Sequence, residues 1–185
     1  MWYFSRGTGI VSLVLFTAVV VLGALGAGRF ATRAWPRFTV AAVHRNLALT
    51  SLAFLAAHIA SAILDGYVPL SWFDVLVPFG SDYRPLWVGL GAVAIDLLLA
   101  IVVTSLLRTR IPARAWRAVH WLAYLCWPVA LAHGFGMAED DAAYGWIVAL
   151  DVVCVLAVLG AVAYRATRHD ADTATRKLSP LGGTR

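Results

Sequence analysis

Hydrophobic residues along the chain gather in five long runs that short polar segments separate. Each run is close to the ~20 residues that an α-helix needs to cross a bilayer. The pattern therefore predicts an all-α integral membrane protein, a bundle of about five transmembrane helices. The predicted spans are residues 9–27, 38–64, 86–107, 115–135 and 144–164.

The composition supports this class. Of 185 residues, 61% are hydrophobic and 14% are charged, and the mean hydropathy is +0.78. A soluble domain of this size could not cover so much apolar surface with polar groups. We therefore expect one membrane domain over residues 1–165, followed by a polar, disordered cytoplasmic tail over residues 166–185.

The basic residues predict the orientation. They gather between the first and second runs, between the third and fourth, and after the fifth, while the other loops are acidic. By the positive-inside rule the basic segments are cytoplasmic, which places the N-terminus outside and the C-terminus inside, with the plasma membrane as the expected location. The pI of about 9.7 then reflects topology, and no nucleic-acid partner is expected. Only Arg6 and Arg84 fall elsewhere.

Histidine supplies the candidate chemistry, because four of the five histidines lie in the second and fourth predicted spans. Polar side chains in a spanning helix are costly and usually face the bundle interior. His44 and His58, fourteen residues apart, share a helix face and lie ~21 Å apart along the axis. That distance excludes one shared zinc or copper ion, whose ligands bind at ~2 Å. Four histidines hydrogen-bonded across helices remain an alternative to metal ligation.

The second pair, His120 and His133, lies about 140° out of phase in a straight helix. Pro128 stands between them, and we expect a change of pitch there to align the two rings. Because the second and fourth spans run parallel, His44 faces His120 on the cytoplasmic side and His58 faces His133 on the outer side. Imidazoles on both faces of an iron suit an electron-transferring haem. The sequence therefore predicts two b-type haems with no covalent attachment.

Other side chains have two interpretations each. An aromatic residue near a predicted haem packs against it or fills the core, and an arginine at the cytoplasmic side pairs with a haem propionate or anchors the helix at the membrane surface. The acidic residues Asp96 and Asp151 fall inside predicted spans. Each is interpreted as a proton relay, a partner of a histidine or a structural group. The cofactor-binding candidates are Trp127, Phe54, Arg45 and Arg117.

The histidine motifs resemble a known family. HRNLALTSLAFLAAH at 44–58 and HWLAYLCWPVALAH at 120–133 are similar to the ferric reductase-like transmembrane domain of ferric reductases and NADPH oxidases, over roughly residues 8–165. The resemblance implies that the four histidines are axial ligands of two b haems. Stand-alone domains of this kind also resemble the haem-bearing membrane subunit of bacterial methionine sulfoxide reductase systems.

The resemblance further implies the activity of an oxidoreductase subunit. Electrons would pass from a flavoprotein reductase or a quinol on the cytoplasmic side to an acceptor protein or ferric ion outside, and membrane lipid would surround the helices. The segment after residue 164 is too short for a flavin and nicotinamide module and the chain has no GxGxxG loop, so we expect no flavin in this chain. A quinol-linked cytochrome b subunit and a haem-free scaffold or transporter are the alternatives.

Overall fold

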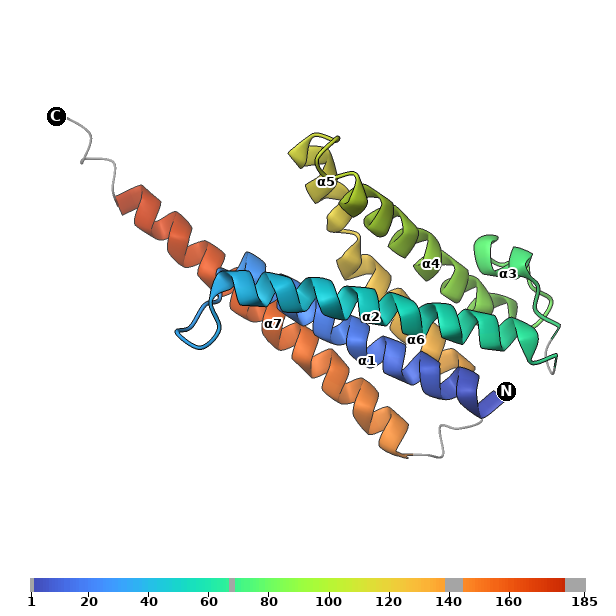
Figure 1. The fold of residues 1–185 in the computed structure, drawn as a ribbon. Helices are drawn as coiled ribbons and strands as arrows, with labels where there is room; N and C mark the ends of the chain where they lie inside the picture. The colour runs from blue at the N-terminus through green and yellow to red at the C-terminus, as the bar shows by residue number, and fades with distance from the viewer. Residues whose placement is uncertain (1, 67–68, 139–144, 179–185) are drawn as a thin grey trace.

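The computed structural model describes residues 2–66, 69–138 and 145–178, with side chains described from residue 3 through residue 168. The regular structure in these ranges is helical, with no strand, so the predicted all-α class is confirmed. Four of the helices are long and apolar enough to cross a membrane, as Figure 1 lets the reader follow. The helices are α1 Trp2–Ala27, α2 Arg37–Leu64, α3 Trp72–Leu76, α4 Pro85–Leu106, α5 Ala113–His120, α6 Ala123–Met137 and α7 Gly145–Leu178.

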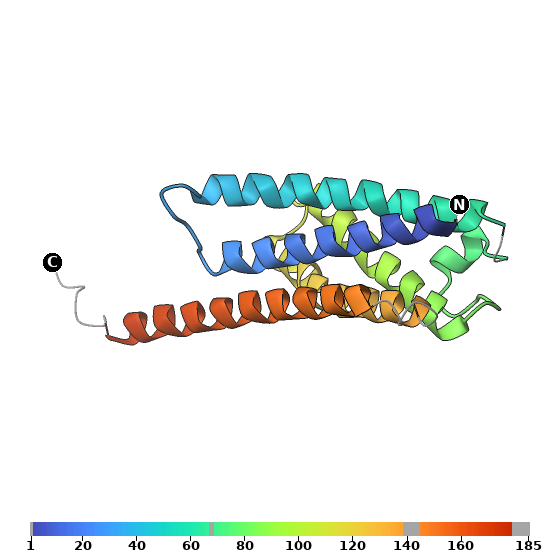
Figure 2. The same ribbon diagram turned by 90° about the horizontal axis from the view of Figure 1, so that it is seen from below.

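Helix α1 lies at the centre of the bundle, between α2 and α7 (Figure 2). It also contacts α6, which packs against α4, and the short α3 packs on α4 (Figure 1). One buried cluster joins α1, α6 and α7, and a second joins α4 and α6. The first contains Val20, Trp127, Cys154 and Val158; the second contains Ala94, Ile101 and Cys126.

Helices α1 and α2 approach closely through small side chains. The Ser12 hydroxyl donates to the carbonyl of Ser51 at 3.5 Å, and the Ser51 hydroxyl donates to the carbonyl of Ser12 at 3.4 Å. Small hydroxyl residues at a helix interface let backbones come together and supply such interhelical bonds. The two serines therefore fix the register of α2 on α1.

Proline and polar side chains set several helix starts. Pro36 precedes α2, Pro112 precedes α5, and Pro85 occupies the first turn of α4, where a missing N–H costs no hydrogen bond. In α3, the Ser71 amide and hydroxyl both donate to the Asp74 carboxylate, and these bonds lower the pKa of that carboxyl. These bonds cap the start of α3.

The predicted fourth span is divided, and the division comes after His120 and not at Pro128, where the sequence predicts a change of pitch. Helix α5 ends at His120, residues 121–122 form a turn, and Pro128 lies inside a continuous α6. In the turn, the Leu122 amide donates to the carbonyl of Val119, three residues back, at 2.9 Å. Such a tight bond rotates the residues that follow, so the pitch changes directly after His120.

A side chain from α7 explains the position of this turn. The Arg165 guanidinium lies 4.2 Å from the centre of the Trp121 ring and donates to the Tyr124 hydroxyl at 2.7 Å. A cation over an indole face and a charged hydrogen bond are both stabilising. Arg165 therefore links α7 to the turn after α5 and to the first turn of α6.

Helix α7 continues well past the fifth predicted span and ends at Leu178, and its end projects beyond the other helices (Figures 1 and 2). The structure thus differs from the expected disordered tail over residues 166–178. Those residues contain no glycine or proline and several strong helix formers, which explains the continuation. The last part of the predicted tail, residues 179–185, lies outside the described residues.

Candidate haem-binding site

His44 on α2 and His120 at the end of α5 face each other. Their ring centres are 6.5 Å apart and their planes are inclined by 65°. Two imidazoles that bind one metal from opposite sides, with metal–nitrogen bonds of about 2 Å, have ring centres roughly 6 Å apart. The spacing of this predicted pair therefore fits a single iron between the rings.

His58 and His133 also lie near each other, close enough for a charge on one imidazole to act on the other. His58 comes from the last third of α2 and His133 from the last turns of α6, at the end of the bundle opposite to the first pair. Both rings are half-buried. The structure thus brings the four histidines together in the two predicted pairs.

Three of the four imidazoles bond to main-chain carbonyls through Nδ1. A carbonyl oxygen only accepts, so Nδ1 must hold the proton and Nε2 keeps the lone pair that can bind a metal. Such a partner fixes both the tautomer and the orientation of a ligand histidine. The distances are 3.0 Å from His44 to Val19 O, 2.8 Å from His58 to Ser5 O and 2.7 Å from His133 to Trp87 O.

His120 is the exception. Its Nδ1 is buried and has no hydrogen-bond partner among the described residues, and its ring stacks on Trp116 with centres 5.0 Å apart. The indole nitrogen of Trp116 is buried without a partner in the same way. Buried polar atoms without partners are rare in proteins, so two together beside the first histidine pair indicate that a further group belongs there.

The packing of α2 agrees with a cofactor that lies between α2 and the helices α5 and α6. Among the described helices, α2 makes extensive backbone contact with α1, whereas its contacts with α5 and α6 are sparse. Yet α5 and α6 contain the histidines that face those of α2. Within the described chain, histidine, cysteine and acidic residues form no cluster of three or more suited to a metal ion.

A family model described as ferric reductase like transmembrane component matches residues 8–131. The chain belongs to this family. The matched range includes His44, His58 and His120 and ends two residues before His133. A search of curated proteins and a search of solved structures each found no match. Ferric reductase-like domains generally bind haem and serve as membrane electron-transfer components that work with other redox partners.

The other predicted site residues of this ferric reductase-like chain occupy different surroundings. Trp127 is buried between α1 and α7, and its indole N–H donates to the Thr17 hydroxyl at 2.9 Å. Phe54 is half-buried on α2, and Arg45 and Arg117 are exposed near the first histidine pair. Their contacts with a haem stay predictions. Asp96 is exposed on α4 and Asp151 is half-buried on α7.

Sequence reasoning missed Trp116, which stacks on His120, and Arg165, which contacts the turn after His120. Trp116 precedes His120 by four residues, which places the two on one face of α5, so its proximity could have been read from the spacing. Arg165 lies 45 residues beyond His120, on α7, and its contact with the turn depends on how α7 packs. No local pattern indicates that contact.

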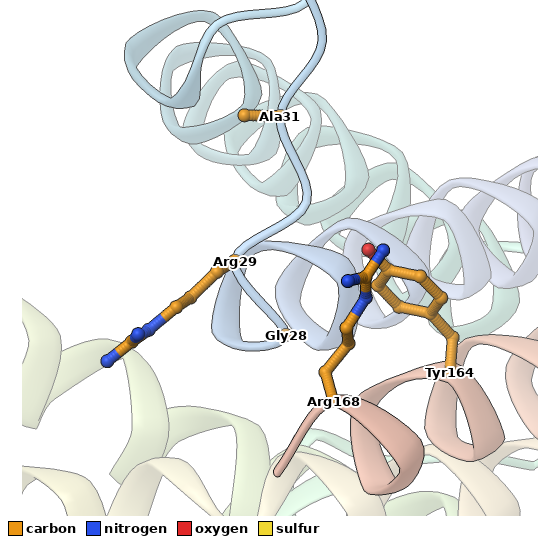
Figure 3. A pocket seen from close by; sticks show the side chains of 5 residues that line it. All are labelled: Gly28, Arg29, Ala31, Tyr164 and Arg168. Carbon is orange, nitrogen blue, oxygen red and sulfur yellow. The ribbon is translucent and has the colours of Figure 1, made fainter. Parts of the chain in front are cut away.

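The end of the bundle near His44 is basic, and we call it the basic end; it contains Arg37, Arg45, Arg108, Arg110, Arg114 and Arg117. A recess of about 280 Å³ opens there between the loop after α1 and helix α7 (Figure 3). In it the Arg168 guanidinium lies 5.3 Å from the centre of the Tyr164 ring, and Arg29 extends away from them.

The opposite end, near His58, we call the distal end. Arg6 donates to the Met137 carbonyl at 2.9 Å and Arg84 donates to the Gly136 carbonyl at 3.1 Å. The last carbonyls of a helix attract cations and lack partners within the helix. Arg6 and Arg84, which lie outside the basic segments of the sequence, therefore cap the end of α6, just after His133.

Proposed function

We propose that this ferric reductase-like chain is a transmembrane carrier with two b-type haems. His44 and His120 bind one haem near the basic end, and His58 and His133 bind the other near the distal end. The observation that supports this most is the facing of His44 and His120 at 6.5 Å. The protonated Nδ1 of three rings adds to it, because Nε2 is then free to bind iron.

Bound haem supplies one-electron chemistry, and the protein sets its position and potential. The four imidazoles would hold two haems at two depths of the bundle, and haem held in this way would supply electron transfer. Arg45 and Arg117 pair with propionates at the basic end. Trp127 and Phe54 complete the apolar surroundings, which exclude water from the path between the haems.

We assign the direction of transfer from charge. Basic segments remain cytoplasmic in membrane proteins, so the basic end faces the cytoplasm of a plasma membrane. The exceptions Arg6 and Arg84 have a structural role at the end of α6 and do not argue against this orientation. Electrons enter at the His44–His120 pair from a flavoprotein reductase or a quinol. They leave at the His58–His133 pair to an acceptor protein or ferric ion.

Haem content tests the proposal directly. A pyridine haemochrome assay and a dithionite-reduced spectrum of the purified chain should give two b haems per chain. A colourless protein would support a scaffold or transporter, and one haem per chain would contradict the pairing. Haem reduction by a quinol that a quinone-site inhibitor blocks would favour the quinol-linked cytochrome b subunit.

Reporter fusions test the direction. A reporter after Arg185 should behave as cytoplasmic, and one inserted after Gly66, which follows α2 at the distal end, should behave as external. The reverse result would invert which haem receives electrons while leaving the haem assignment intact.

A further inference from the structure

The three anchored histidines share a second feature beyond the carbonyl bond. In each case a glycine stands four residues after the carbonyl that accepts from Nδ1, on the same helix, and its backbone faces the imidazole. Helix α1 supplies two of these carbonyl–glycine pairs and α4 supplies the third. The pairs are Val19 with Gly23 at His44, Ser5 with Gly9 at His58, and Trp87 with Gly91 at His133.

Helix geometry explains why the glycine stands at this position. The carbonyl of residue i points along the axis toward the amide of residue i+4, so a side chain at i+4 lies beside the carbonyl oxygen. An outside donor must enter through that space to reach the second lone pair of the oxygen. A glycine at i+4 leaves the space open, and a larger residue closes it.

The distances measure how closely each ring uses that space. A Cβ placed on Gly91 would lie 2.7 Å from Cε1 of His133, and one on Gly9 would lie 2.9 Å from Nδ1 of His58. Carbon atoms in contact prefer 3.5 to 4.0 Å, about the closest approach without repulsion. At Gly23 the nearest atom, Cε1 of His44, is 3.4 Å away, so an alanine fits there with little movement.

The spacing along α1 mirrors the spacing along α2. Gly9 and Gly23 are fourteen residues apart, as are His58 and His44, and the two helices run antiparallel. Fourteen residues leave both glycines near one face of α1, ~21 Å apart. One helix thus offers two matching positions to the two histidines of its neighbour.

We propose that these carbonyl–glycine pairs are positioning devices that fix three of the four haem ligands in the Nδ1–H tautomer and strengthen them as donors to iron. The inference rests on the proposed haem ligation. A hydrogen bond from Nδ1–H raises the basicity of the ligand and favours ferric over ferrous iron, which lowers the reduction potential. The distal pair has two such bonds and the basic pair has one, so the distal haem has the lower potential from this cause.

The test is a set of glycine-to-alanine variants of the full chain, with the midpoint potential of each haem followed by optical redox titration. Gly9→Ala and Gly91→Ala, on different helices, should raise the potential of the same haem, the distal one, and leave the other unchanged. Gly23→Ala should shift the basic haem slightly. Gly7→Ala and Gly134→Ala are the controls, because a Cβ at either position meets nothing within 4 Å.

Several outcomes would overturn the inference. Potentials in Gly9→Ala and Gly91→Ala equal to those of Gly7→Ala would show that the glycines do not act on the ligands. Shifts in different haems would contradict the shared distal site. A wild-type chain without haem would instead overturn the proposed function, and the haemochrome assay reports this separately.

A double variant covers the case in which Gly91→Ala assembles poorly. If the glycine acts through the ring, Gly91→Ala should cause no further loss of folded protein in a His133→Ala background, because the Cβ then has room. Additional loss in that background would show that Gly91 serves helix packing alone and would overturn the inference at this site.

Discussion

The two histidine pairs show two ways of positioning the same ligand. At the distal end both rings bond to main-chain carbonyls, and the α6 helix that contains His133 is capped by two arginines. At the basic end His44 bonds to a carbonyl, whereas His120 stacks on Trp116 and is followed by a turn that Arg165 holds from α7. Main-chain bonds thus anchor both rings of the distal pair. At the basic pair a main-chain bond anchors His44, and side-chain contacts position His120.

This difference affects how firmly each imidazole ring is oriented before a cofactor binds. A carbonyl within a packed helix is fixed by the helix itself, so a ring bonded to it is pre-organised before a cofactor binds. His120 has no such bond, and its buried Nδ1 lacks a partner among the described residues. We infer that main-chain bonds orient both rings of the distal pair, whereas His120 of the basic pair is oriented by its contact with Trp116.

Removing a single histidine, from either pair, should have the largest effect. His133→Ala and His120→Ala should each reduce the haem content from two to one per chain. His133→Ala also removes the bond to the Trp87 carbonyl, and a hydrogen bond contributes about 1 kcal/mol to folding. The apo form of His133→Ala should therefore unfold more readily than that of His120→Ala.

Haemochrome assays and thermal unfolding in detergent measure both quantities. Greater destabilisation by His120→Ala, or loss of both haems in either variant, would contradict the difference between the pairs.

Arg165→Met should disturb the basic pair alone. The change removes the cation from the Trp121 ring and the hydrogen bond to Tyr124, together about 2 kcal/mol. The turn after His120 then loses its support from α7, so the haem at His44 and His120 should be lost or shifted in its spectrum. Arg168→Met is the control, since Arg168 lies over Tyr164 of its own helix. An unchanged basic haem with an altered distal haem would refute this role.

Arg84→Gln should produce the mirror result with a smaller effect. Arg84 donates to the Gly136 carbonyl near the end of α6, and loss of such a charged bond at a helix C-terminus costs about 1 kcal/mol. The distal haem should therefore shift while the basic haem keeps its spectrum. Low-temperature difference spectra that resolve the two haems would measure this, and equal shifts in both haems would count against it.

Much of the fold follows from the sequence. The hydrophobic runs at 38–64 and 86–107 agree with α2 and α4 to within a residue or two, because apolar length is a local property that the bilayer requires. The break after His120 could not be foreseen. Hydropathy runs unbroken across it, and the group that stabilises it, Arg165, comes from a helix distant in sequence. Pro128 was the visible local signal, and α6 accommodates it without interruption.

The site was predictable to a similar depth. The fourteen-residue spacing of His44 and His58 predicted that they share a face, and the structure brings each close to its predicted partner. The carbonyl partners were not visible, because a main-chain oxygen leaves no mark in the sequence. The sequence does contain a glycine four residues after each of these carbonyls. Gly9 and Gly23 are fourteen residues apart, as are the two histidines of α2, and this equal spacing could have indicated the carbonyl partners.

The smallest expected effect, and the sharpest on the basic pair, comes from Trp116→Phe. Phenylalanine keeps the ring that stacks on His120 and removes the indole N–H, which is buried without a partner among the described residues. An unsatisfied buried N–H costs about 1 kcal/mol or more, so in the apo form the change should be neutral or stabilising. If the N–H meets a haem carboxylate, the same change should instead weaken the holo form and speed release of the basic haem. Thermal unfolding of both forms, together with haem transfer to an apo-globin acceptor, would measure this reversal of sign. Equal changes in the two forms would show that Trp116 contributes its ring alone, and that His120 completes its surroundings without help from its neighbour.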